Sequence, residues 1–158
     1  MSDAEARCDR FCHGTKTMND ERRAASIRSG LRWGLTALFL LRILAQPLAN
    51  RIPALPPFDT WQGSHLPYPL LLASQFVIFS LMVWGNLRAP ELRAQPRLAR
   101  VLTIIGAAYF VMMFVRLCVG LVWTDAPVWF QRPLPAFFHL VLASWMLLMA
   151  REWGRPHV

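Results

Sequence analysis

The stretch Arg100–Trp123, RVLTIIGAAYFVMMFVRLCVGLVW, decides the fold of this chain. With a rise of about 1.5 Å per residue, a helix of this length can cross a hydrocarbon core of about 30 Å. Arg116 lies in its last third. Because a charged side chain is costly inside a bilayer, we expect neighbouring helices to hydrate or pair this guanidinium group. The stretch therefore predicts a membrane protein with several crossings.

Three further apolar stretches predict an all-α protein, a polytopic bundle of four transmembrane helices with a disordered N-terminal tail. The first stretch is the least regular, because Arg42 and Gln46 interrupt it and Pro47 closes it. The predicted organisation is a polar cytoplasmic tail over residues 1–30, a transmembrane domain over 31–151 with spans at about 31–49, 66–87, 101–123 and 134–150, and a cytoplasmic tail over 152–158.

The first 29 residues are polar, mixed in charge and nearly free of large apolar side chains, so we expect a disordered or loosely helical tail. This tail is too long for a signal peptide, and Arg42 argues against cleavage, so the first apolar stretch is interpreted as a retained helix. Cys8, Cys12 and His13 lie close together, but a structural zinc site needs a fourth ligand and none is evident. No metal is predicted there.

Basic residues indicate the orientation of the chain. The net charge is +8, but most cations flank the apolar stretches instead of forming one stripe, which is typical of topology signals and not of nucleic-acid binding. The predicted outer connectors carry only Arg51 and Arg132. The N-terminal segment, the middle connector and the C-terminus hold the others: Arg7, Arg10, Lys16, Arg22, Arg23, Arg28, Arg32, Arg88, Arg93, Arg97, Arg100, Arg151 and Arg155. We expect an inner-membrane protein with both termini in the cytoplasm.

Each predicted span contributes a polar side chain at a similar depth on the outer side. By helical rise, Arg42 and Arg116 lie about 10 Å below the outer ends of their spans. Gln75 lies about 12–14 Å and His139 about 7–8 Å from the outer starts of theirs. Because such groups are costly against lipid, we expect them to share the bundle interior.

No Asp or Glu lies inside any predicted span, and the nearest acids are Asp59 and Asp125 in the outer connectors. One interpretation is structural: these acids dip inward, or Arg42 and Arg116 extend to lipid phosphates. The other interpretation is functional, because the planar guanidinium group suits a carboxylate or phosphate. On that interpretation the two arginines hold an anion.

The predicted ligand-binding residues form one outward pocket. Arg42 and Arg116 anchor an anionic small molecule or lipid headgroup, which the protein binds or transports. The other members are hydrogen-bonding partners and a lid, namely Gln75, His139, Asp59, Trp61 and His65. The alternative is a non-catalytic accessory or scaffolding subunit of a larger membrane complex. Beyond the lipid bilayer, the expected partners are an anionic ligand, and a membrane protein or a second copy of the chain.

Motifs for catalysis are absent from the sequence: it holds no P-loop, no H-E-x-x-H, no G-x-S-x-G and no dinucleotide-binding glycine pattern. A haem held by two intramembrane histidines would need a partner for His139. A quinone site at His139, Arg116 and Trp145 is a less specific alternative. The sequence therefore predicts no cofactor and gives little support for an enzyme.

Overall fold

The computed structural model describes residues 3–49, 51–52, 67–92, 95–123, 125, 127 and 129–155, with side chains from residue 22 onward. Within these residues it contains four helices and no strand: α1 (Asp3–Leu48), α3 (Tyr68–Arg88), α4 (Pro96–Val122) and α5 (Pro133–Trp153). The predicted all-helical class is confirmed. The chain divides into two compact units, Met1–Leu31 and Arg32–Val158. The second unit holds the residues of the predicted pocket.

The first unit is helical, because α1 begins at Asp3. The expectation for this tail is a disordered or loosely helical segment, and the structure shows the helical alternative from Asp3 onward. The segment up to Leu31 holds four Ala and five Arg, which favour helix, and it holds no proline. The proline inside α1, Pro47, comes only at its end. This segment is too polar to form a hydrophobic core, but its residues are compatible with a helix.

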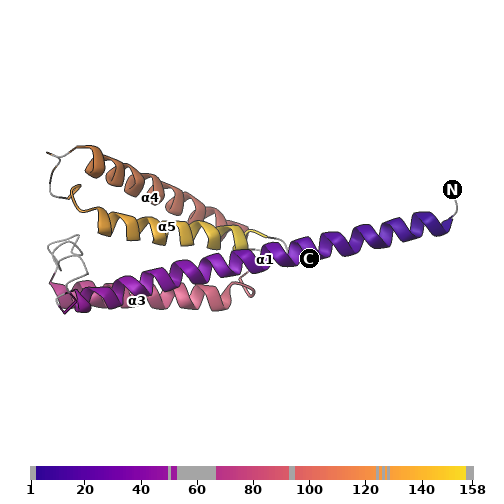
Figure 1. Ribbon diagram of the computed structural model, residues 1–158, viewed down its shortest axis with the longest axis horizontal. Helices are drawn as coiled ribbons and strands as arrows, with labels where there is room; N and C mark the ends of the chain where they lie inside the picture. The colour runs from indigo at the N-terminus through magenta and orange to yellow at the C-terminus, as the bar shows by residue number, and fades with distance from the viewer. Residues whose placement is uncertain are drawn as a thin grey trace. The chain divides into compact units, whose positions relative to one another are not determined.

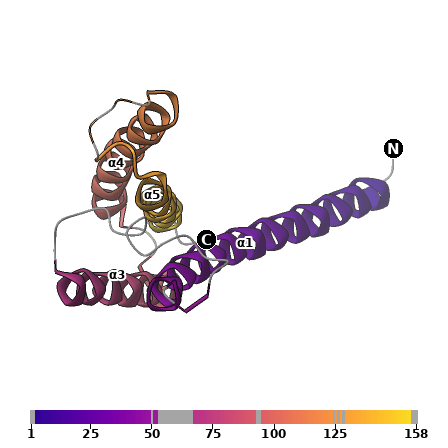
Figure 2. The same ribbon diagram turned by 60° about the vertical axis from the view of Figure 1, so that its left-hand side comes forward.

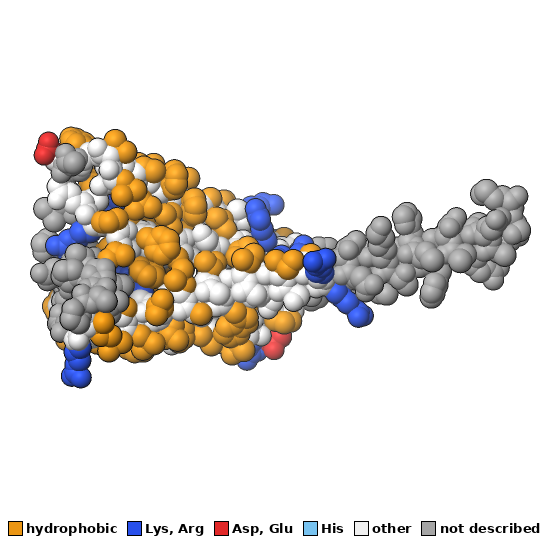
Figure 3. Space-filling view, viewed as in Figure 1, with side chains coloured by type: hydrophobic (Ala, Val, Ile, Leu, Met, Phe, Trp, Pro, Cys, Tyr) orange, Lys and Arg blue, Asp and Glu red, His pale blue; other side chains and the backbone are white. Residues whose placement is uncertain are grey.

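Three of the helices, α3, α4 and α5, are long and apolar enough to cross a membrane by length and composition. They hold 21, 27 and 21 residues, against about 20 needed for a crossing. Figure 3 shows hydrophobic side chains covering the visible face of this part of the molecule. The chain therefore has the character of a membrane protein. The α1 segment is not among these three helices, since Arg32, Arg42 and Gln46 reduce its apolar character.

Prolines set two of the helix starts. Pro96 and Pro133 occupy the first turns of α4 and α5, where a missing N–H removes no helical hydrogen bond. As a result, α4 begins a few residues before the predicted span. At the other end of the chain, α5 continues to Trp153, so Glu152 belongs to the helix and not to a tail.

The buried residues of α3 and α4 recur at intervals of three, four and seven, as expected for a helix with one packed face. In α3 they are Gln75, Met82, Gly85 and Asn86, and in α4 they are Ala99, Gly106, Met113 and Arg116. The helix with the most buried residues is α5, which contacts both α4 and α3. Figures 1 and 2 both show α4 beside α5. The other faces of α3 and α4 carry exposed apolar side chains.

Gly85 allows α3 to approach α5 closely. A Cβ atom at this position would lie 2.9 Å from Cη2 and 3.0 Å from Cζ2 of Trp145. The indole ring therefore fills the space that a larger residue would need. The cluster around this contact includes Phe39 and Ile43 of α1, Met82 of α3 and Met149 of α5, all of them buried.

The second unit has two ends, which we name for a residue at each. At the Trp129 end, α1 ends, α3 begins, and α4 connects to α5 (Figure 1). At the Glu152 end, α3 ends, α4 begins and α5 ends. Consecutive helices thus run in opposite directions.

Candidate functional site

Arg42 lies on the buried face of α1, with 4% of its surface exposed. Its guanidinium carbon lies over the ring of Phe138 in α5, 5.1 Å from the ring centroid. Its Nε atom has no hydrogen-bond partner among the described residues. The side chain therefore brings a permanent charge into the bundle, and its contact there is with an aromatic face.

Arg116 of α4 is also buried, at 3% exposure, and is held by the turn between α4 and α5. Its Nε and Nη2 atoms donate hydrogen bonds to the carbonyl oxygen of Trp129, at 3.1 and 2.8 Å. The guanidinium group also stacks on the Trp129 ring, 4.0 Å from its centroid. These partners are neutral, so the geometry of Arg116 is fixed while its charge is not compensated by them.

Tyr109 of α4 and His139 of α5 form a hydrogen-bonded pair. The Tyr109 hydroxyl lies 2.6 Å from Nδ1 of His139, and the two rings meet edge to face. Arg42 and Arg116 both interact electrostatically with the Tyr109 hydroxyl and with the His139 ring. Four side chains from α1, α4 and α5 therefore converge on one region, which we call the Arg42–Arg116 cluster: Arg42, Tyr109, Arg116 and His139.

The chemistry of the cluster favours an acceptor. If the Tyr109 hydroxyl donates to Nδ1, the proton of a neutral His139 ring lies on Nε2, which is then a donor. Together with the guanidinium N–H groups of Arg42 and Arg116, the cluster presents donors and two positive charges. Among the described residues, no carboxylate forms an ion pair with either arginine. An oxyanion is the kind of group that such a set of donors binds best.

Gln75 of α3 is buried at 3% exposure, and neither atom of its amide has a hydrogen-bond partner among the described residues. The same holds for Gln46 of α1, at 1% exposure. Helices α1 and α3 run antiparallel, and the hydrogen bond between Thr36 and Asn86 joins them. Gln46 lies ten residues after Thr36 and Gln75 eleven residues before Asn86, so the two glutamines lie at a similar height along the helices. They form a second pair of unsatisfied polar groups toward the Trp129 end. No contact joins Gln75 to the Arg42–Arg116 cluster among the interactions of the described side chains.

The remaining members of the predicted pocket are the three residues of its lid. Asp59, Trp61 and His65 lie outside the described residues. Asp125 is described and is exposed, so it does not dip into the bundle. The low exposure of Arg42 and Arg116 likewise does not fit side chains that extend to lipid phosphates. Within the structural interpretation, a pairing of these arginines with Asp59 stays a prediction.

A second polar group lies toward the Glu152 end. Arg32 of α1 and Glu152 of α5 form a buried ion pair, with Nη1 and Oε2 3.4 Å apart. Nearby, Asn86 of α3 donates to the Thr36 hydroxyl of α1 at 2.9 Å and accepts from the indole N–H of Trp145 in α5 at 3.0 Å. These contacts join three helices. They differ from the Arg42–Arg116 cluster because the arginine here has a carboxylate partner.

Sequence reasoning did not identify Tyr109, Gln46 or the second polar group as functional residues. A signal for Tyr109 existed, since it lies seven residues before Arg116 and so shares its helix face. Asn86 and Glu152 lie near the ends of apolar stretches, where polar residues are usual, and gave no such signal.

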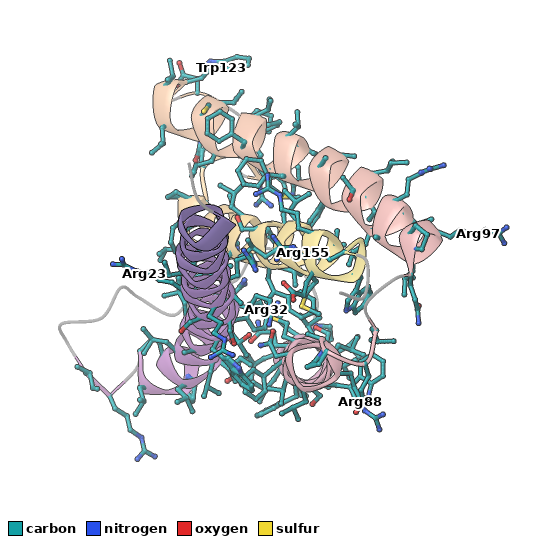
Figure 4. The ribbon with its side chains drawn as sticks, turned by 90° about the vertical axis from the view of Figure 1, so that its right-hand side faces the viewer. Arg23, Arg32, Arg88, Arg97, Trp123 and Arg155 are labelled. Atoms are coloured by element: carbon teal, nitrogen blue, oxygen red, sulfur yellow. The ribbon has the colours of Figure 1, made fainter. Side chains whose placement is uncertain are left out.

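A shallow cavity of ≈ 330 Å³ lies elsewhere, at the start of α4, and is lined by Gln95, Pro96, Arg97 and Leu98. It is separated from Tyr109 by about 17 Å of helix and takes no part in the cluster. Figure 4 shows Arg97 directed away from the helices, as is Arg88, whereas Arg32 lies on the side of α1 that faces them.

No family model, no curated protein and no solved structure matches this chain.

Proposed function

We propose that this protein is an integral inner-membrane protein that binds an oxyanion at the Arg42–Arg116 cluster. In this proposal residues 31–48 of α1 form a fourth crossing beside α3, α4 and α5. The termini lie in the cytoplasm, because most Lys and Arg residues belong to the segments on that side. The cluster then lies in the outward half of the bundle, and its ligand reaches it from the outer surface or from the outer leaflet.

The observation that carries the proposal is the state of Arg42. It is almost fully buried, it has an aromatic ring and no carboxylate as its neighbour among the described residues, and it shares the Tyr109–His139 pair with a second buried arginine. Intramembrane arginines are costly and are usually paired or functional. Two of them near one hydrogen-bonded pair are well suited to a carboxylate or a phosphate, which would supply the missing charge.

The experiment measures the melting temperature of the purified full-length protein in detergent, with phosphate, acetate or phosphatidylglycerol added. Saturation at about 100 times the dissociation constant should stabilise the protein by about 2.7 kcal/mol. For a chain of this size, that corresponds to a rise of about 5–10 °C. Arg42→Gln and Arg116→Gln should remove the rise while leaving a folded protein.

Arg51→Gln is the matched control, since Arg51 is exposed and follows α1 at the same end of the bundle. This variant should keep the full rise. If no oxyanion raises the melting temperature, and if Arg42→Gln instead reduces the amount of assembled protein, the arginines serve the bundle or a partner subunit. That result would overturn the proposal in favour of an accessory or scaffolding role.

A further inference from the structure

Four of the seven buried residues of α1 in the second unit are polar. Its inward positions follow the three-and-four spacing of a packed helix, and the polar ones among them are each at most 7% exposed: Arg32, Thr36, Arg42 and Gln46. By helical rise they extend over about 21 Å, compared with a hydrocarbon core of about 30 Å. Polar groups at several depths of a bundle interior are costly, and they are typical of substrate and ion pathways.

The two arginines on this face differ in their partners. Arg32 is paired with Glu152, and both side chains are buried. Arg42 lies ten residues further along α1 and has no carboxylate among the described residues. The carboxylate of Glu152 is itself an oxyanion of the class proposed for the outward site. The Glu152 carboxylate therefore occupies the position on Arg32 that a bound oxyanion would occupy.

An apolar layer separates the two arginines. Phe39 lies between them on α1, and it belongs to one buried cluster with Met82 of α3 and Met149 of α5, both at 0% exposure. Methionine side chains are flexible and tolerate repacking, so a layer built on them can open without breaking a helix. The same cluster continues to Ala99 and Trp153 at the Glu152 end, so apolar side chains pack along the interior beside the ion pair as well.

We infer that the polar face of α1 is a pathway for the oxyanion and that the Arg32–Glu152 pair is its inner gate. The inference rests on the proposed function and extends it from binding to translocation. The ligand binds at Arg42 and Arg116, passes the methionine layer, and displaces Glu152 from Arg32 before it leaves at the Glu152 end. Its chemistry is that of a carboxylate or a phosphate, either free in water or on a lipid headgroup.

The test uses the full chain reconstituted in lipid vesicles and the substitution Glu152→Gln, which removes the competing charge and keeps the size of the side chain. One arm measures uptake of labelled phosphate and labelled acetate. The other arm measures the exchange between leaflets of fluorescently labelled phosphatidylglycerol. Because breaking a buried ion pair shifts an equilibrium by more than a decade, the rate should rise about tenfold or more in one arm. A rise in the first arm identifies a free anion, and a rise in the second identifies a headgroup.

Glu91→Gln is the matched control, because Glu91 follows α3 at the same end and pairs with Arg88 on the exposed surface. It should leave both rates at the wild-type level. Adding Arg42→Gln to Glu152→Gln should abolish the rise, since the ligand would no longer bind at the outward site. Met82→Ala provides a second route, because it opens the apolar layer without changing a charge, and it should also raise the rate.

The melting assay distinguishes a failure of the oxyanion site from a failure of the gate. If the wild-type protein shows a rise in melting temperature with an oxyanion, while folded Glu152→Gln and Met82→Ala proteins show wild-type rates in both arms, the site is supported and the gate is overturned. If no oxyanion stabilises the wild-type protein, the proposed function fails and the gate fails with it. If Glu152→Gln does not fold, the rates of Met82→Ala decide.

Discussion

Replacing each of two buried arginines of α1 by methionine should change stability in opposite directions. Arg42 and Arg32 are exposed to 4% and 7%, and both belong to the same face of one helix. Methionine fills a similar length of side chain without a charge. The expected difference comes from Glu152, which lies 3.4 Å from Arg32 and has no counterpart at Arg42 among the described residues.

The size of each effect follows from these contacts. A guanidinium group at the centre of a span costs about 2.5–3.5 kcal/mol, and less toward an end. The contact of Arg42 with the Phe138 ring, at 5.1 Å, returns about 1–2 kcal/mol. Arg42→Met should therefore stabilise the ligand-free protein by about 1–2 kcal/mol. Arg32→Met removes the guanidinium group that pairs with the buried Glu152 carboxylate, and should destabilise the protein by about 3–5 kcal/mol.

The measurement is the free energy of unfolding of the full chain in mixed micelles, titrated with a denaturing detergent in a buffer free of phosphate and carboxylates. Leu44→Met is the control, since Leu44 is exposed on the same helix and should change the free energy by no more than about 0.5 kcal/mol. The two arginine variants should differ by about 4–7 kcal/mol. A loss of more than about 1 kcal/mol in Arg42→Met would show that Arg42 has a structural partner, and the argument for an anion site would fail.

Three further substitutions test the contacts around the two polar groups. Asn86→Leu should destabilise the protein by about 1–3 kcal/mol, since the buried indole N–H of Trp145 loses its acceptor; a neutral result in the same unfolding titration would contradict this. Gly85→Ala should lower the free energy of unfolding by about 1–3 kcal/mol, because the new methyl group would lie 2.9 Å from the Trp145 ring, which is held by its hydrogen bond. Gly34→Ala is the control, since no atom lies within 4 Å of the added methyl group. Arg116→Lys cannot reproduce the two hydrogen bonds to the Trp129 carbonyl, so amide hydrogen exchange in the peptide containing Trp129 should become about 10–100 times faster, and unchanged exchange would show that the turn is held by other contacts.

Hydrophobic length was sufficient to predict three of the helices, because a run of about 20 apolar residues has few alternatives to a transmembrane helix. It was not sufficient for α1. Polarity predicted a disordered or loosely helical tail and could not decide between the two, because a helix needs no core when its residues favour the conformation. Helix α5 continues to Trp153, past the last apolar run, so the charge of Glu152 does not end the helix.

The candidate site was predicted in part, as far as helix depth could indicate it. Depth placed Arg42, Gln75 and Arg116 among residues that need the bundle interior, and the structure buries all three. Tyr109 could not be identified by depth alone, and its signal was the seven-residue spacing from Arg116, which places both residues on one face of α4. Asn86 required knowledge of the packing, because its two partners come from different helices.

The weak hydrophobicity of α1 and the proposed chemistry have the same cause. The residues that lower its apolar character, Arg32, Arg42 and Gln46, are those that it turns toward the other helices. The exposed positions of the same segment, such as Leu41 and Leu44, are apolar. A helix that is apolar outside and polar inside can reside in a bilayer only when a bundle covers its inner face. The three helices α3, α4 and α5 meet the requirement for a crossing by themselves, so they can supply that cover. The proposed oxyanion would supply the charge that the polar face of α1 lacks at Arg42.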